Sequence, residues 1–255
     1  YIINEKLPSE LENWGVNKGV VIQMIEGNHQ YPFLSDIING PIDVDKLDYL
    51  LRDAHHVGLR YSFDLDYFLG SYTVLGDETN LNVCHLGLEK TPQAVVTAEL
   101  FIIIWKSMYD LVYHAQDSRI AEKMLEKAIL VSKDHRSVKE AFTEIDRFLE
   151  LDDERLFVLL EDVGGRSKEL VQAIRANKLY KTLLDTELDQ EHFEMSTDFI
   201  AWLDRDEDGL CDHLSNELNE RLGHADYGFI CDIIRSKAPY EIHIDEKDEE
   251  TGEYV

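Results

Sequence analysis

The sequence feature that most constrains the fold is a helix over residues 43–58 that has a start signal and a stop signal. Gly40 and Pro41 interrupt any regular structure before it. Asp43 can cap the first turn, because its carboxylate can accept hydrogen bonds from backbone N–H groups that have no partner inside the helix. Gly58 can end the helix, because glycine adopts the left-handed backbone at little steric cost. These signals predict a helix with well-defined ends.

The residues between these signals form distinct faces. The apolar face consists of Val44, Leu47, Leu50, Leu51 and Val57, which recur at helical spacing. Two polar lines accompany it, one of Lys46, Tyr49 and Asp53 and one of Asp45, Asp48 and Arg52. Such a helix is either an ion-paired surface or one wall of a site for a metal and a phosphate. The residues alone favour the ion-paired surface.

The same stretch carries a family resemblance. The string I-D-V-D-K-L-D-Y-L-L-R-D-A-H-H-V-G, from Ile42 to Gly58, resembles the fifth-motif helix of the HD-domain phosphohydrolases. It is especially similar to the branch of the SAM-and-HD-domain deoxynucleoside triphosphate triphosphohydrolases, and it matches every fixed position of that pattern. The resemblance implies a metal-dependent hydrolase that splits a dNTP into deoxynucleoside and triphosphate.

The resemblance also implies roles for single residues. Asp45 matches the final aspartate ligand of a divalent metal, and a carboxylate suits Mg, Mn or Fe. Lys46 would meet phosphate oxygens as a point charge. Tyr49 and Asp53 would contact the sugar, with Asp53 accepting a hydrogen bond from its hydroxyl.

A second, shorter match is M-Y-D-L-V-Y, which ends at Tyr113. In the family Tyr113 would pack on the sugar face, and His114 stands where a polar residue faces the base. Two positions depart from the family pattern. Trp105 replaces an arginine that often binds phosphate, and Ala115 replaces a common histidine.

The upstream part of the metal site is missing, since the sequence contains no His-Asp dipeptide. Catalytic metal sites generally need about three protein ligands, so Asp45 alone is insufficient. We expect a segment before Tyr1, or a separate chain, to supply the others. The alternative is a non-catalytic HD-fold subunit that binds nucleotides or acts as a scaffold.

A third motif competes as a cation site. Residues 204–212 have the D-x-D-x-D-G-x-x-D spacing of a calcium loop, with Ser215 where the last glutamate ligand is expected. Aspartate and glutamate are abundant throughout this chain, so a solvated acidic turn is the favoured interpretation. The candidate calcium ligands are Asp204, Asp206, Asp208 and Asp212.

The net charge of −27 bears on the partners. So acidic a chain opposes binding to nucleic acid or to anionic membranes. We find no signal peptide and no apolar run that could span a bilayer, so a cytoplasmic protein is expected. The three cysteines, Cys84, Cys211 and Cys231, have no paired spacing, which predicts isolated thiols in a reducing compartment. Family relatives suggest a homo-oligomer.

Capped amphipathic segments dominate the chain, so the predicted fold is mainly α. We expect the C-terminal part of an HD-type helical bundle over residues 1–178 and a small α+β appendage with an acidic tail over residues 179–255. A β-hairpin is predicted from residues 72–75 and 81–86, and a long central helix over residues 92–113. Further strands are predicted at residues 179–182, 226–234 and 241–244.

Overall fold

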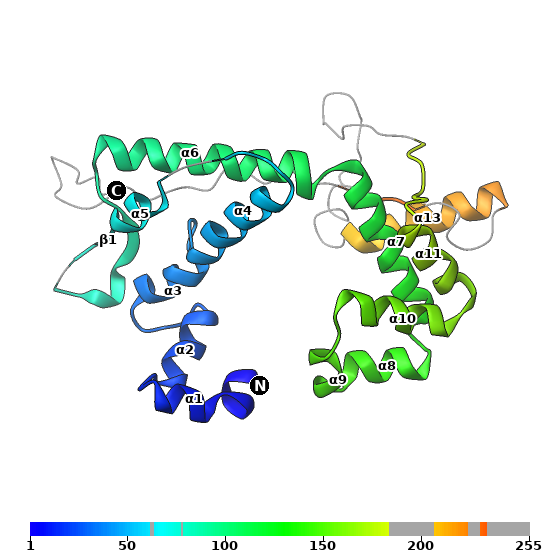
Figure 1. Cartoon of the computed structure of the whole chain (residues 1–255), viewed down its shortest axis with the longest axis horizontal. Coiled ribbons are helices and arrows are strands. Elements are labelled where there is room, and N and C mark those ends of the chain that lie inside the picture. Colours follow the sequence, from blue (N-terminus) through cyan, green and yellow to red (C-terminus); the bar gives the residue numbers. More distant parts are fainter. Residues whose placement is uncertain (62–63, 78, 184–206, 224–229, 234–255) are drawn as a thin grey trace. The chain divides into compact units, whose positions relative to one another are not determined.

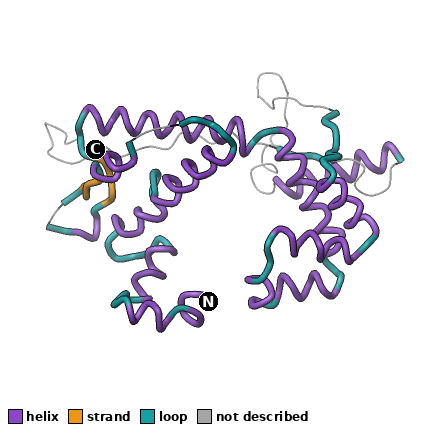
Figure 2. Tube along the Cα trace, viewed as in Figure 1, coloured by secondary structure: helices purple, strands orange, loops and turns teal. Residues whose placement is uncertain are grey.

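The computed structural model describes residues 1–61, 64–77, 79–183, 207–223 and 230–233, with the side chains of Glu207, Asp208 and Leu222 left out. The described chain is mainly helical, with one two-stranded antiparallel sheet (Figures 1 and 2). The prediction of a mainly α fold with a β-hairpin is therefore confirmed. Among the described residues, no helix is both long enough and apolar enough to cross a bilayer.

The chain divides into two compact units, which we describe separately. Among the described residues, unit 1 contains those up to Leu111, and unit 2 contains those from Val112 onward. The division falls inside the predicted first domain, and the boundary predicted near residue 178 stays a prediction.

The described residues of unit 1 form six α-helices and the hairpin. Its elements are α1 (Pro8–Asn13), α2 (Lys18–Ile25), α3 (Pro32–Asn39), α4 (Val44–His56), α5 (Leu65–Gly70), β1 (Tyr72–Leu75), β2 (His85–Leu88) and α6 (Pro92–Met108). Short π-helical turns cover Ile2–Lys6 and Tyr109–Tyr113, the latter spanning the division between the units. Asp43 caps α4 as predicted, and Asn17, Asp64 and Thr91 likewise accept a backbone N–H in the first turn of α2, α5 and α6.

The hairpin differs from the predicted one in its second strand. Tyr72 pairs with Leu88 and Leu75 with His85, while Leu81–Val83, expected as strand, form a 3-10 turn. The hairpin is fixed to α3, since the N–H of Leu86 donates to the Asp36 carboxylate at 2.9 Å. The hairpin thus lies beside the start of α4.

The core of unit 1 includes the region where α4 and α5 pack against α6. Phe68 on α5 and Phe101 on α6 are fully buried, with their ring centroids 6.0 Å apart. The long helix was expected to be central, and its buried residues include Phe101, but Val96, Leu100 and Ile103 on another face of α6 are exposed. The helix also ends earlier than predicted, at Met108, and a π turn follows it.

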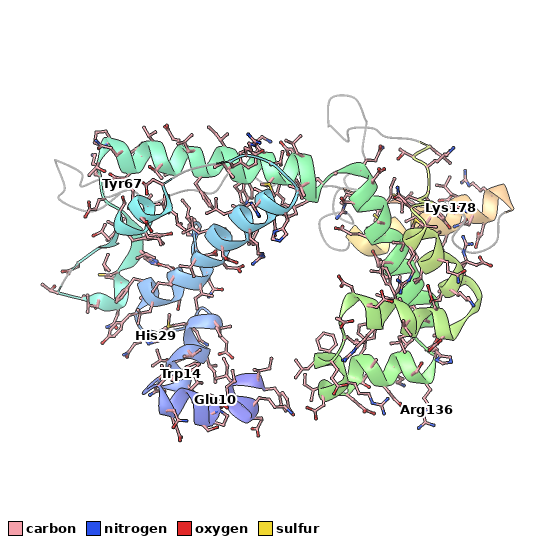
Figure 3. All side chains as sticks on the ribbon, in the orientation of Figure 1. Glu10, Trp14, His29, Tyr67, Arg136 and Lys178 are labelled. Atoms are coloured by element: carbon pink, nitrogen blue, oxygen red, sulfur yellow. The ribbon has the colours of Figure 1, made fainter. Side chains whose placement is uncertain are left out.

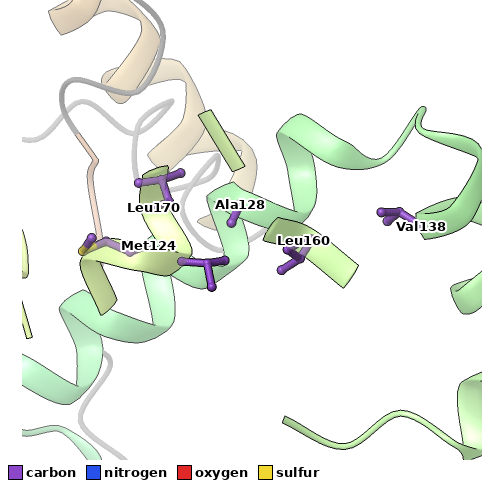
Figure 4. Close-up of a cluster of buried hydrophobic side chains, with 6 residues drawn as sticks. Met124, Ala128, Val138, Leu160 and Leu170 are labelled. Carbon is purple, nitrogen blue, oxygen red and sulfur yellow. The ribbon is translucent and has the colours of Figure 1, made fainter. Parts of the chain in front are cut away.

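Unit 2 is a helical cluster. It contains α7 (Gln116–Ser132), α8 (Arg136–Thr143), α9 (Ile145–Leu149), α10 (Asp153–Val163), α11 (Gly165–Arg175) and α13 (Glu207–Leu222). Helix α7 packs against α10 and α11. The buried side chains at its centre are Met124, Ala128, Val138, Leu160, Leu170 and Val171 (Figure 4).

Not every polar residue near a helix start in unit 2 is a cap. Asp152 caps α10, but α7 begins at Gln116, so Asp117 lies in its first turn, where its charge suits the helix dipole. Helices α8 and α11 likewise begin before Ser137 and Ser167, and Ser167 is buried inside α11. A polar side chain in the first turn resembles a cap in sequence.

The appendage strands are not observed in the described residues. Residues 179–182 have no regular secondary structure, because Leu179 and Tyr180 pack against the helical core instead of pairing with another strand. Residues 230–233 are also irregular, and the remaining predicted strand residues lie outside the described part of the chain.

Candidate functional site

Helix α4 presents the residues expected to form the site. Its buried face, Leu47, Leu50 and Ala54, fixes the helix in unit 1. Lys46, Tyr49 and Asp53 are half-buried and follow one another at steps of three and four residues, so they share a line along the helix. Figure 3 shows this helix with its side chains on the ribbon. The predicted alignment of these three residues is thus present on a single rigid element.

The helix is fixed at both ends. Asp43 Oδ1 accepts the N–H of Lys46 at 2.7 Å, and Asp43 is itself nearly buried. At the other end, Gly58 has a φ of +78° and donates its N–H to the carbonyl of His55. Both signals found in the sequence therefore act as expected, and they hold the polar line in register.

Lys46 is anchored within the first turn. Its Nζ is ion-paired with Asp43 Oδ2 and donates to the Gly40 carbonyl at 3.0 Å. Both partners lie at the N-terminal end of α4, where the helix dipole contributes positive charge. The arrangement places a cation beside a helix N-terminus, where Asp43 both caps the helix and pairs with the ammonium.

The residue before Asp43 is bonded to the hairpin of unit 1. Tyr72 on β1 donates its hydroxyl to the Ile42 carbonyl at 2.7 Å. Burial, and secondarily the nearby charge of Asp43, raises the pKa of Tyr72 well above its usual range. A small cavity of about 20 Å³ adjoins this point, lined by residues that include Asp36, Ile42 and Tyr72. It has room for about one water molecule, so it is no nucleotide pocket.

Asp45 is exposed in the first turn of α4, next to Lys46. In the described residues, no group of three or more histidine, cysteine, aspartate or glutamate side chains could hold a metal. A single carboxylate does not make a catalytic metal site. The residues described here therefore do not fit the metal by themselves.

Two histidines at the end of α4 are exposed, whereas a tryptophan at an expected phosphate-binding position is buried. His55 and His56 are exposed at the end of α4, with their rings 5.7 Å apart. Trp105, at the position where relatives often have a phosphate-binding arginine, is buried with its ring 4.7 Å from that of Tyr109. A buried indole in this place cannot serve a phosphate as arginine would.

The last residue of the second motif, Tyr113, and the adjacent His114 belong to unit 2, whereas α4 belongs to unit 1. That these two residues face Lys46, Tyr49 and Asp53 across one pocket stays a prediction.

The calcium motif falls partly outside the described residues, which exclude Asp204, Asp206 and the side chain of Asp208. The backbone of α13 is already helical from Glu207, so Gly209 lies in a helix and not in a turn. Asp212 is ion-paired with the nearly buried ammonium of Lys127 on α7. It therefore serves to join two helices.

Comparison with known proteins places the chain in a family. The family model described as the HD associated region matches residues 81–236, well over half of the sequence. The chain belongs to the HD-associated region family. The match begins after α4 and does not cover the motif helix.

The chain is also similar in sequence to three known proteins. It is 27% identical over 204 residues to the deoxynucleoside triphosphate triphosphohydrolase SAMHD1 homolog of Dictyostelium discoideum, covering 71% of this chain and 34% of that protein. It is 27% identical over 155 residues to human SAMHD1, covering 61% and 20% respectively. An uncharacterized protein of Methanocaldococcus jannaschii, MJ1154, is 29% identical over 149 residues, covering 58% and 30%.

These matches confirm that the chain is a member of the HD-domain phosphohydrolase superfamily related to the SAMHD1 branch. HD-domain phosphohydrolases generally use divalent metals. The chain spans about a fifth to a third of the length of these relatives.

Two features of the chain were not predicted from its sequence. The first is the ion pair of Asp43 with Lys46, although a separation of three residues on a helix is a known signal for such a pair. The second concerns the cysteines, which were predicted to be isolated. Cys84 is buried alone among the described cysteines, but Cys211 and Cys231 are in contact, and no sequence pattern marks that pair.

Proposed function

We propose that this chain contributes the motif-helix wall of a nucleotide site in an HD-superfamily phosphohydrolase. The substrate would be a dNTP, and the products would be deoxynucleoside and triphosphate. The observation that supports this most is the line of Lys46, Tyr49 and Asp53 along one half-buried face of α4, in a helix that matches the family motif throughout.

The residues of α4 suit different parts of a dNTP. Lys46, beside the helix N-terminus, would attract the phosphates. Tyr49 lies one turn further on and would pack on the sugar, while Asp53 would accept a hydrogen bond from the sugar hydroxyl. Tyr113 and His114 are proposed to complete the pocket against the sugar and the base.

The metal site requires residues beyond those described. Asp45 would supply one hard oxygen ligand for Mg, Mn or Fe. We propose that the histidine and His-Asp ligands of the family come from an upstream segment or from another chain. A metal would then supply an activated water, and we assign this chain's residues only to binding and orienting the nucleotide. Assembly as a homo-oligomer remains part of the proposal.

The test uses the full open reading frame of the gene, expressed and supplied with Mg, Mn or Fe. We expect triphosphate release from dGTP or another dNTP. Asp45→Asn should abolish that release, and Lys46→Met should weaken dNTP binding. Asp48→Asn is the matched control, because Asp48 is an exposed carboxylate on the same helix. Release that is unchanged in Asp45→Asn would contradict the proposal.

A second function rests on Trp105. Its burial at the expected phosphate-binding position favours a non-catalytic HD-fold subunit that binds nucleotides or acts as a scaffold. Under that alternative, the full-length protein would bind dNTPs in calorimetry and release no triphosphate with any of the three metals. The same preparation therefore distinguishes the two functions.

A further inference from the structure

Two cysteines of unit 2 are brought together from positions 20 residues apart in sequence. Cys211 lies on α13 and is buried, and Cys231 lies in the described segment 230–233 and is half-buried. The two thiols interact, and a single serine hydroxyl bonds the backbone of both residues. Proximity of the two backbones is the first geometric requirement for a disulfide.

Hydrogen bonds to the backbone of each cysteine hold the two residues together. Ser215, one turn after Cys211 on α13, donates its hydroxyl to the Cys211 carbonyl at 2.7 Å. The hydroxyl oxygen of Ser215 also accepts the N–H of Cys231 at 2.8 Å. One buried serine thus fixes the backbone of both cysteines relative to each other.

The neighbouring residue ties the segment to a third element. Asp232 accepts two hydrogen bonds from the Arg119 guanidinium of α7, at 2.6 and 2.9 Å. Lys123, one turn further along α7, lies 3.8 Å from the same carboxylate. Segment 230–233 is therefore held between α7 and α13, and the thiol contact belongs to that arrangement.

The two thiols have unequal chemistry. The hydrogen bond from Cys211 lowers the pKa of the Cys231 thiol to about 7, with burial and the Asp232 charge opposing and Lys123 assisting. The same contact, together with burial, raises the pKa of Cys211. At neutral pH Cys231 is therefore substantially thiolate, the nucleophilic form, while Cys211 keeps its proton.

We propose that Cys211 and Cys231 form a reversible dithiol–disulfide site that exchanges with small-molecule disulfides. The Cys231 thiolate attacks one sulfur of the small disulfide, forms a mixed disulfide and releases one small thiolate. Cys211 then attacks the Cys231 sulfur, loses its proton and releases the second small thiolate. The two cysteines lose two electrons in total, and the small disulfide gains them and becomes two thiols.

The disulfide would join α13 covalently to the segment that Asp232 anchors on α7. It would close a loop of 19 intervening residues, which restricts the unfolded chain and so favours the folded arrangement of unit 2. The site is independent of the α4 residues and does not depend on the proposed hydrolase function.

The test exposes the full chain to oxidised glutathione, stops the exchange with acid and measures intact and peptide masses. We expect the loss of two hydrogen atoms per chain, a cross-linked peptide pair containing Cys211 and Cys231, and reversal by dithiothreitol. Cys84 is the internal control, since its buried thiol donates to the Asp77 carbonyl at 3.3 Å. Cys231 should react roughly tenfold faster than Cys84, because Cys231 is only half-buried whereas Cys84 is 1% exposed.

Two variants separate the steps. Cys211→Ser should stop at a stable glutathione adduct on Cys231, and Cys231→Ser should give neither adduct nor disulfide while keeping the wild-type circular dichroism spectrum. The proposal is overturned if Cys84 reacts first, if the adduct persists in the wild type, or if Cys211→Ser takes up no glutathione at Cys231.

Discussion

The carboxylate of Asp43 binds Lys46 twice: Oδ1 accepts the backbone N–H of Lys46 at 2.7 Å, and Oδ2 is ion-paired with its ammonium. One nearly buried side chain thus caps α4 and holds the cation that the proposed nucleotide site needs. The Asp43 side chain is 5% exposed, whereas that of Asp48, which pairs with Arg52 on the same helix, is 67% exposed.

This difference predicts unequal effects of removing the two carboxylates. Asp43→Ala should lower the stability of unit 1 by about 2 kcal/mol, because it removes a cap and leaves a half-buried ammonium without its carboxylate. Asp48→Ala should cost only about 0–0.5 kcal/mol, as exposed ion pairs do. Urea denaturation followed by circular dichroism measures both, and equal shifts in midpoint would show that Asp43 has no special role.

The raised pKa of Tyr72 predicts that the folded protein loses stability at high pH. Its pKa is raised in the folded protein, so the unfolded chain loses this proton first as the pH rises above about 10. The stabilising contribution of neutral Tyr72 is complete below that pH and declines progressively above it, toward the raised folded pKa.

The matched variants are Tyr72→Phe and Tyr67→Phe. Tyr72→Phe should cost about 1 kcal/mol at neutral pH, from the lost hydrogen bond to Ile42, and should reduce the decline in stability above pH 10. Tyr67 bonds Thr91 at 3.1 Å and is more exposed, so its variant should decline like the wild type (labelled in Figure 3). The urea midpoint measured from pH 7 to 11 checks this, and parallel curves for Tyr72→Phe and the wild type would contradict it.

The two glycines that flank α4 are required for different reasons. A Cβ at Gly40 would lie 2.4 Å from the Asp36 carbonyl oxygen, which is backbone and cannot rotate away. A Cβ at Gly58 would meet no atom within 4 Å, but its φ of +78° disfavours any side chain. Gly58→Ala should therefore cost about 1–2 kcal/mol from backbone strain alone.

Gly40→Ala should cost more than Gly58→Ala, because the chain between α3 and α4 must move to relieve the overlap. Gly58→Asn should recover part of the loss, since asparagine tolerates the left-handed region better than alanine does. Thermal unfolding of the three variants gives the order, and a smaller effect at Gly40 would show that the turn before α4 is free to adjust.

The Arg119–Asp232 pair predicts local protection of segment 230–233. Asp232→Asn leaves one amide oxygen where two carboxylate oxygens each accept a charge-assisted hydrogen bond from Arg119, so the amide of Cys231 should exchange with solvent at least about tenfold faster. Glu122→Gln is the control, because Glu122 pairs with the same arginine but is far more exposed. Hydrogen exchange read by mass spectrometry makes the measurement, and equal exchange rates in the two variants would exclude this anchoring role.

Local signals in the sequence determined most of unit 1. Asp43 and Gly58 delimit α4 because a cap and a left-handed glycine act within a few residues, and Thr91 with Pro92 starts α6 for the same reason. The periodicity of Lys46, Tyr49 and Asp53 was sufficient to place them on one line. The family resemblance, which also rests on residues adjacent in sequence, was confirmed.

Tertiary packing decided what those local signals could not. Residues 179–182 have the composition of a strand, but Leu179 and Tyr180 gain more by packing on the helical core than an unpaired strand would provide. Cys211 and Cys231 meet only because Ser215 and Asp232 fix a distant segment against α13 and α7. Contacts between residues far apart in sequence depend on the packing of the whole unit, so no spacing pattern in the chain encodes them.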